Sequence, residues 1–171
     1  MTQDVLIRSD KFLLRPFTEN DVEIKVSWLN DPEIKKTLIL KDEISVKTTL
    51  EWFNNSRADP TRKDFIIETN GGEIIGTIGL RKISEQQRSA CIYIIIGNKA
   101  YWGKGVMFET ERMLITWAFK EAGLEKIWAH VRSSNIASVI TMKKLGFKCN
   151  VDSDADQDVL YLTLSMQGFR L

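Results

Sequence analysis

Apolar residues follow two different periods in the middle of this chain, and the change between them separates a strand from a helix. Residues 89–97 are apolar at almost every position, which is typical of a strand that is buried on both faces. Residues 104–122 carry apolar side chains at every third or fourth position, which predicts a helix with one buried stripe. A short turn that contains Gly103 and Gly105 joins the two segments.

The same reading of the other segments predicts a mixed α/β chain with the order β-α-α-β-β-β-α-β-α-β-β. Thr18 and Ser45 suit the N-cap positions of the first two helices, and Asn70-Gly71 favours a tight hairpin turn. Residues 33–44 predict only a turn or a partial helix. We expect one domain over residues 1–171. The further strands are expected at 11–17, 65–67, 74–80, 125–132, 147–152 and 159–166, and the further helices at 18–30, 45–57 and 135–145.

The turn between the buried strand and the long helix has the geometry of a phosphate-binding site. Several main-chain N–H groups lie there at the positive end of a helix dipole, and glycine allows a ligand to approach the backbone. Two familiar phosphate loops do not fit, because Phe108 replaces the third glycine of the dinucleotide fingerprint and Gly105 follows Lys104 where the P-loop needs Ser or Thr. On its own, the turn fits a plain helix start with two turn glycines equally well.

The segments that follow make the turn more informative. A strand at 126–131 leads into Ser134-Asn135-Ile136-Ala137-Ser138 and a short helix that ends at Gly146-Phe147. In this order and spacing, the segments resemble the GNAT superfamily of acyl-CoA N-acyltransferases, over about residues 7–166. The resemblance implies a mixed, mostly antiparallel sheet flanked by helices, with splayed central strands. Leu14-Arg15-Pro16 and Asn30-Asp31-Pro32 are similar to the ribosomal-protein N-terminal acetyltransferase (RimJ/RimL-like) branch.

The resemblance implies acetyl-CoA as the co-substrate and no metal. The turn would hold the pyrophosphate, the buried strand would offer main-chain groups to the thioester and the pantetheine arm, and Asn135 would bind that arm or instead cap its helix. Trp102 and Met107 depart from the usual motif residues, but neither change removes a main-chain donor. The expected cofactor-binding residues are Ile94, Ile95, Ile96, Trp102, Gly103, Lys104, Gly105, Val106, Met107 and Asn135.

Acetyl transfer to an amine needs a base, donors for the thioester oxygen and a partner for the leaving thiolate. Met142 stands where many relatives have Tyr, and a thioether cannot donate a proton. The resemblance to the ribosomal-protein branch implies a Ser three residues after the Asn as the donor instead, which is Ser138 here. Ser138 fits a local bond to the helix backbone equally well. Cys91 replaces the Glu that often serves as base. His130, the one histidine, is then the candidate base, followed by Glu68, although both also fit structural roles.

We therefore expect an acetyl-CoA-dependent N-acetyltransferase that acts on a primary amine. The acceptor classes are a protein N-terminus, an amino sugar or nucleotide-linked amino sugar, a polyamine and a drug amine. The departures at Cys91 and Met142 leave open a non-catalytic acyl-CoA-binding or sensing module. A Cys–His hydrolase conflicts with the apolar strand around Cys91, because burial raises the pKa of a thiol. The family's acceptor pocket corresponds to Trp28, Trp52 and residues 38–42 and 152–158.

Composition limits the partners and the location. The net charge of +1 lacks the basic excess of a nucleic-acid-binding protein. The charged first ten residues and the short apolar runs predict neither a signal peptide nor a membrane span, which favours the cytoplasm. Cys91 and Cys149 lack metal-ligand spacing, so we expect two reduced, buried thiols. Homodimers are frequent among proteins of the resembled family, and a homodimer is compatible with this chain.

Overall fold

Eight strands form one sheet with the order β1-β2-β3-β4-β5-β6-β8-β7. The structure is a computed structural model that describes residues 5–39, 42–150 and 158–170. Three short 3-10 turns lie at Glu19–Asp21, Lys99–Tyr101 and Met166–Gly168. The strands are β1 Ile7–Arg8, β2 Phe12–Pro16, β3 Lys63–Thr69, β4 Ile74–Ser84, β5 Ser89–Ile96, β6 Lys126–Arg132, β7 Lys148–Asn150 and β8 Val159–Ser165. The helices are α1 Val22–Asn30, α2 Pro32–Thr37, α3 Val46–Ser56, α4 Val106–Lys120 and α5 Ile136–Leu145.

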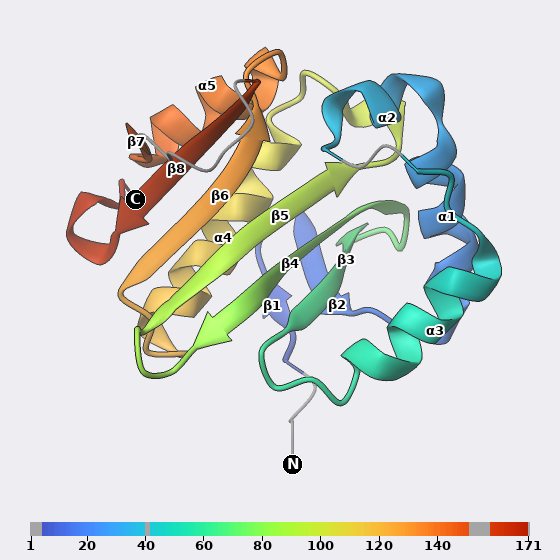
Figure 1. The fold of residues 1–171 in the computed structure, drawn as a ribbon, viewed down its shortest axis with the longest axis horizontal. Helices are drawn as coiled ribbons and strands as arrows, with labels where there is room; N and C mark the ends of the chain where they lie inside the picture. Colours follow the sequence, from blue (N-terminus) through green and yellow to red (C-terminus); the bar gives the residue numbers. More distant parts are fainter. Residues whose placement is uncertain (1–4, 40–41, 151–157, 171) are drawn as a thin grey trace.

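The two central strands run parallel and then separate. The β5–β6 register pairs Ser89 with Lys126 and ends at the pair Cys91–Trp128, although β5 continues to Ile96. All other neighbouring strands are antiparallel. Figure 1 shows β5 and β6 diverging toward the end of the sheet where α2 and the start of α4 lie. The predicted mixed, mostly antiparallel sheet with splayed central strands is confirmed.

Helices cover both faces of the sheet. Successive residues of a strand point to opposite sides, so both faces of β3 carry apolar side chains that the helices bury. Phe65 and Ile67 of β3 pack in the large cluster that includes the buried stripe of α4. Ile66, which lies between them, packs on the other face with α1 and α3. Figure 1 shows α4 behind the strands and α1, α2 and α3 together at one side of the sheet. The sheet is therefore buried on both faces at β3.

An ion-pair cluster fixes the entry into α1. Arg15 donates to both carboxylate oxygens of Asp21, at 2.8 and 2.9 Å, and to Glu68 at 2.8 Å. The Thr18 N–H also donates to Asp21, as the predicted capping box requires. Burial opposes ionisation of Asp21, but the bonds from Arg15 and Thr18 outweigh it and hold the pKa of this carboxyl below its ordinary value. Glu68 is thus committed to a structural ion pair.

Three expectations need correction or completion. The partial helix expected within residues 33–44 is α2, which begins at Pro32 and ends at Thr37, because Asp31 accepts hydrogen bonds from the first turn and Pro32 suits its first position. Cys149 is exposed, and the expectation of a buried thiol is wrong there, because β7 is a short strand at the edge of the sheet. Residues 40–41 and 151–157, parts of the expected acceptor pocket and of the strand at 147–152, lie outside the described residues.

Candidate active site

A cleft of about 1540 Å³ opens where β5 and β6 diverge. Its walls come from the ends of these strands, the turn before α4, the start of α5 and the helices α1 to α3. Lys104 does not line it, and the Lys104 ammonium lies 5.6 Å from the centre of the Tyr101 ring instead. The other residues expected at the site do line it, namely Ile94, Ile95, Ile96, Trp102, Gly103, Gly105, Val106, Met107, His130, Asn135 and Ser138.

The phosphate turn, residues 102–107, presents unused main-chain donors. Gly103 and Gly105 have positive φ angles of 72° and 77°, and a Cβ at either position would meet no atom of the described chain within 4 Å. No main-chain hydrogen bond within the described ranges uses the N–H groups of Gly103, Gly105, Val106 or Met107. These donors stand at the start of α4, where the helix dipole favours an anion. The turn can therefore bind a pyrophosphate through its backbone.

The edge of β5 that faces the gap also carries available main-chain groups. The Trp102 indole N–H donates to the Ile96 carbonyl at 2.8 Å, which ties the phosphate turn to the end of the strand. Main-chain groups two residues apart in a strand point the same way, so those of Ile94 face the gap as well. The register with β6 has already ended at Trp128, so no strand among the described residues covers this edge. It can donate to a carbonyl oxygen in the gap.

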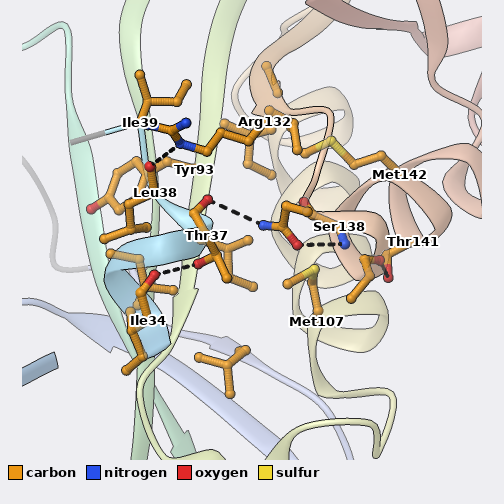
Figure 2. A pocket seen from close by; sticks show the side chains of 18 of the residues that line it. Ile34, Thr37, Leu38, Ile39, Tyr93, Met107, Arg132, Ser138, Thr141 and Met142 are labelled. Carbon is orange, nitrogen blue, oxygen red and sulfur yellow. Dashed lines mark hydrogen bonds between the residues drawn. The ribbon is translucent and has the colours of Figure 1, made fainter. Parts of the chain in front are cut away.

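Asn135 joins α5 to the end of α2 across the cleft. Its side-chain oxygen accepts from the Ser138 N–H at 3.3 Å, and its amide donates to the Thr37 carbonyl at 3.5 Å. Arg132 donates to the Leu38 carbonyl beside this bond, as Figure 2 shows. Asn135 is thus the N-cap of α5, one of the two roles expected for it. Ser138 is 4% exposed, and its hydroxyl has no hydrogen-bond partner in the part of the chain that the structure describes.

The opposite end of the cleft, which we call the acceptor end, is lined by Lys25, Trp52, Arg62, Arg81 and Tyr93. The Lys25 ammonium lies 3.4 Å from the centre of the Trp52 ring, and Arg62 lies 5.4 Å from it. Burial lowers the pKa of Lys25 to about 8. Tyr93 packs on Gly79, where a Cβ would come within 2.7 Å of the ring.

Asp64 links two of these side chains, since it accepts from Arg62 at 2.9 Å and from the Tyr93 hydroxyl. Burial raises the pKa of Tyr93 well above its ordinary value, and the nearby Asp64 carboxylate raises it further. Tyr93 therefore stays neutral and donates a hydrogen bond to the Asp64 carboxylate. Trp52, which the family resemblance placed in the acceptor pocket, is a wall of the acceptor end. Trp28 does not line the cleft, because it packs against Gly97.

The candidate bases are now separated. His130 lines the cleft, with its ring centre 5.2 Å from that of Tyr161 and 5.4 Å from that of Trp128. Glu68 is held by Arg15 outside the cleft, and Cys91 is fully buried and does not line it. Neither Glu68 nor Cys91 can reach a ligand there. A Cys91–His130 hydrolase therefore has no support in this geometry.

Sequence reasoning missed Lys25, Arg62, Arg81 and Tyr93. Only Tyr93 had a visible signal, as the one hydroxyl within the run of isoleucines in β5. Within the described ranges, no three His, Cys, Asp or Glu side chains gather in a way that could hold a metal ion. A search of the same ranges finds no helix long and apolar enough to cross a membrane.

Comparison with known proteins agrees with this geometry. The family model described as acetyltransferase (GNAT) domain matches residues 11–148. An N-acetyltransferase 9-like protein of Caenorhabditis briggsae is 26% identical over 184 residues, which cover 100% of this chain and 90% of that protein. An uncharacterised N-acetyltransferase of Bacillus licheniformis, p20, is 26% identical over 144 residues, 82% of this chain and 80% of the relative.

A solved structure with the same fold is the spermidine N-acetyltransferase from Vibrio cholerae in complex with CoA and spermine. It superposes with a TM-score of 0.84 at 22% identity, over 94% of this chain and 98% of that one. At this identity, the likeness shows the fold.

Proposed function

The chain belongs to the GNAT acetyltransferase family, whose co-substrate is acetyl-CoA, and we propose that it transfers the acetyl group directly to the amine of a small molecule. The relatives include general N-acetyltransferases and a spermidine N-acetyltransferase. The proposal therefore rests on the family as a whole and not on its ribosomal-protein branch. Acylation of a protein N-terminus, a homodimer and a cytoplasmic location stay predictions.

One observation carries the proposal. The phosphate turn, the open edge of β5, Ser138 and the acceptor end all line the same cleft, and the splay of β5 and β6 lies between them. A diphosphate on the turn would direct the attached arm along β5 into the gap, with its thioester beside the main chain of Ile94. An amine that enters past Trp52 would meet the thioester from the other side. Such a site aligns two substrates, which accounts for much of the rate of a transfer reaction.

The residues of the cleft have separate tasks in this reaction. An amine with a pKa of about 10 loses its proton at pH 7 at a cost of roughly 4 kcal/mol, so a base is useful. His130 is the candidate base, either directly or through a water molecule. The main chain of Ile94 stabilises the charge that develops on the thioester oxygen. The Ser138 hydroxyl donates a hydrogen bond to the sulfur that leaves.

A matched pair of variants tests the cofactor assignment. Asn and Asp have the same size and both tolerate a positive φ angle, so Gly105→Asn and Gly105→Asp differ mainly in charge. A carboxylate about 6 Å from a doubly charged diphosphate repels it, and this repulsion weakens the binding free energy of acetyl-CoA by about 2 kcal/mol. The figure assumes an effective dielectric constant between those of water and the protein surface. We expect acetyl-CoA to bind Gly105→Asp about 30-fold more weakly than Gly105→Asn by isothermal titration calorimetry. Equal affinities would contradict a diphosphate at this turn.

Turnover separates an enzyme from a binding module. We expect thiol release from acetyl-CoA in the presence of at least one member of a panel of primary amines. Tight binding of acetyl-CoA without thiol release for any amine would favour the non-catalytic acyl-CoA-binding module instead. Thiol release without an amine acceptor would indicate hydrolysis and would contradict the proposal.

A further inference from the structure

The charges that line the cleft have one sign. Its described lining contains five cationic side chains, Lys25, Arg62, Arg81, Arg132 and Lys144, and no Asp or Glu. Three of them, Lys25, Arg62 and Arg81, belong to the acceptor end. A polyamine would meet like charges there, and like charges that face each other at short range are unfavourable. The acceptor end therefore favours a ligand that is not a polycation.

Arg62 and Arg81 lie side by side on the sheet. The β3–β4 register pairs Lys63 with Leu80, so Arg62, just before β3, and Arg81 of β4 are the next residues along the two segments, and both line the cleft. Lys63 points toward α4, as its contact with Trp117 shows, so the arginine pair faces the side covered by α1 and α3. Two like charges in directly opposed positions destabilise a sheet unless an anion lies between them.

The described residues provide too few carboxylates to neutralise the three cations Lys25, Arg62 and Arg81. Asp64 pairs with Arg62 at 2.9 Å. Lys25 is 8% exposed and forms no salt bridge to a described residue, and its ammonium lies over the Trp52 ring, 3.4 Å from the ring centre. The Arg81 Nε is buried, and no described residue accepts a hydrogen bond from it. A buried donor without a partner is costly, which makes this group a ready site for an oxyanion.

This cluster is separate from the phosphate turn. Arg81 pairs with Cys91 near the beginning of β5, whereas the turn follows Ile96 at its end. The five residues between them span about 16 Å along the strand. A diphosphate on the turn cannot also neutralise Arg81 at that distance. The cations of the acceptor end must therefore serve another ligand.

Building on the proposed function, we propose that the acceptor amine carries an oxyanion, a phosphate or a carboxylate, that binds Lys25, Arg62 and Arg81. The guanidinium groups hold two oxygens through paired N–H donors, and the ammonium adds a point charge. The anion anchors the acceptor at the start of β5, and its amine then points toward the gap. Trp52 provides an apolar wall for the part of the acceptor between the two groups.

Pairs of amines that differ only in the anionic group test the proposal. We would compare glucosamine with glucosamine 6-phosphate, ethanolamine with O-phosphoethanolamine, and β-alaninamide with β-alanine, and include spermidine, by thiol release from acetyl-CoA. We expect the anionic member of at least one pair to have a kcat/KM about tenfold higher or more. The phosphate pairs and the carboxylate pair distinguish the two sources of the oxyanion. Preference for spermidine or for the neutral members would overturn the proposal.

Variants connect the preference to the cluster. Arg81→Met should remove most of it, and Lys25→Met should reduce it in the same direction. Arg112→Met is the matched control, because Arg112 is exposed on α4, lies outside the cleft and loses the same charge. A preference that survives Arg81→Met and Lys25→Met would refute the assignment. Acetyl-CoA titration of each variant reports whether it is folded.

The experiment also separates this proposal from the proposed function. If acetyl-CoA does not bind the wild-type protein, the proposed function fails and the present proposal fails with it. If acetyl-CoA binds but no amine in the panel is acetylated, titration of inorganic phosphate into the acetyl-CoA-saturated protein decides. Phosphate binding that weakens about tenfold in Arg81→Met and not in Arg112→Met supports the oxyanion site. No binding, or equal binding by both variants, overturns it.

Discussion

Glu111 should make this protein less stable as the pH rises. It lies on the buried stripe of α4, is 0% exposed, and neither carboxylate oxygen has a hydrogen-bond partner among the described residues. Burial raises the pKa of Glu111 from 4.5 to about 8. Because the folded state holds the proton more tightly than the unfolded chain, the carboxyl is neutral in the folded protein at pH 7.

The size of the effect follows from linkage. Below the unfolded-state pKa of 4.5, Glu111 is protonated in both states and does not lower the free energy of unfolding. Above the folded-state pKa of about 8, the full loss of stability from Glu111 is present. The total is roughly 5 kcal/mol, at about 1.4 kcal/mol per pH unit, and about 3 kcal/mol of it develops between pH 5 and pH 8. This is a large share of the total stability of a typical domain.

Glu111→Gln isolates this contribution, because it keeps the shape and removes the ionisation. In urea denaturation at pH 5, the variant and the wild type should have similar free energies of unfolding. At pH 8 the variant should be more stable by about 3 kcal/mol. If both proteins lose stability equally between pH 5 and pH 8, Glu111 is not the buried acid that the structure indicates.

Three further predictions concern the active site and the packing of the fold. Ser138→Ala should lower kcat by about tenfold with little change in KM, because a donor to the leaving sulfur acts mainly in the transition state. Ser133→Ala, at an exposed serine, is the control, and an unchanged kcat in Ser138→Ala would remove Ser138 from the mechanism. Gly97→Ala should cost about 2 kcal/mol in urea denaturation, because the added Cβ would lie 2.0 Å from the Trp28 ring, and an unchanged midpoint would contradict this contact. Iodoacetamide should modify Cys149 well before the fully buried Cys91, as peptide mass spectrometry would report. The reverse order would show that Cys91 is reactive and would support the Cys–His hydrolase.

Local patterns were enough to predict most of the elements, because burial enforces them. The run of isoleucines in β5 is typical of a strand that is buried on both faces, and the regularly spaced apolar residues of α4 are typical of a helix with one buried side. The glycines of the phosphate turn were also visible in the sequence, because their positive φ angles carry little steric strain only in glycine. Ser138 was chosen through the family resemblance and His130 as the one histidine of the chain, and the structure adds that both line one cleft.

The acceptor end could not be predicted, because it depends on distant contacts. Arg62 and Arg81 come together only through the register of β3 and β4, and that register shifts at an irregularity between Ile67 and Glu68, so the hairpin turn alone does not give it. Lys25 stands three residues after Val22 and four before Leu29, within the buried stripe of α1. A lysine there suggests a solvated edge of the helix, yet the Trp52 ring from α3 covers it.

The geometry divides the work of the cleft between main chain and side chains. Asn135 uses its oxygen to cap α5 and its amide to reach Thr37, so its side chain is committed to joining the two walls. Apart from the Ser138 hydroxyl, the groups with spare hydrogen-bonding capacity toward acetyl-CoA are then main-chain ones, in the phosphate turn and on the edge of β5. The proposed main-chain binding does not depend on side-chain identity, so it would tolerate Trp102 and Met107 in place of the usual motif residues. Side chains concentrate at the acceptor end, where the proposed oxyanion site of Lys25, Arg62 and Arg81 would set the choice of amine.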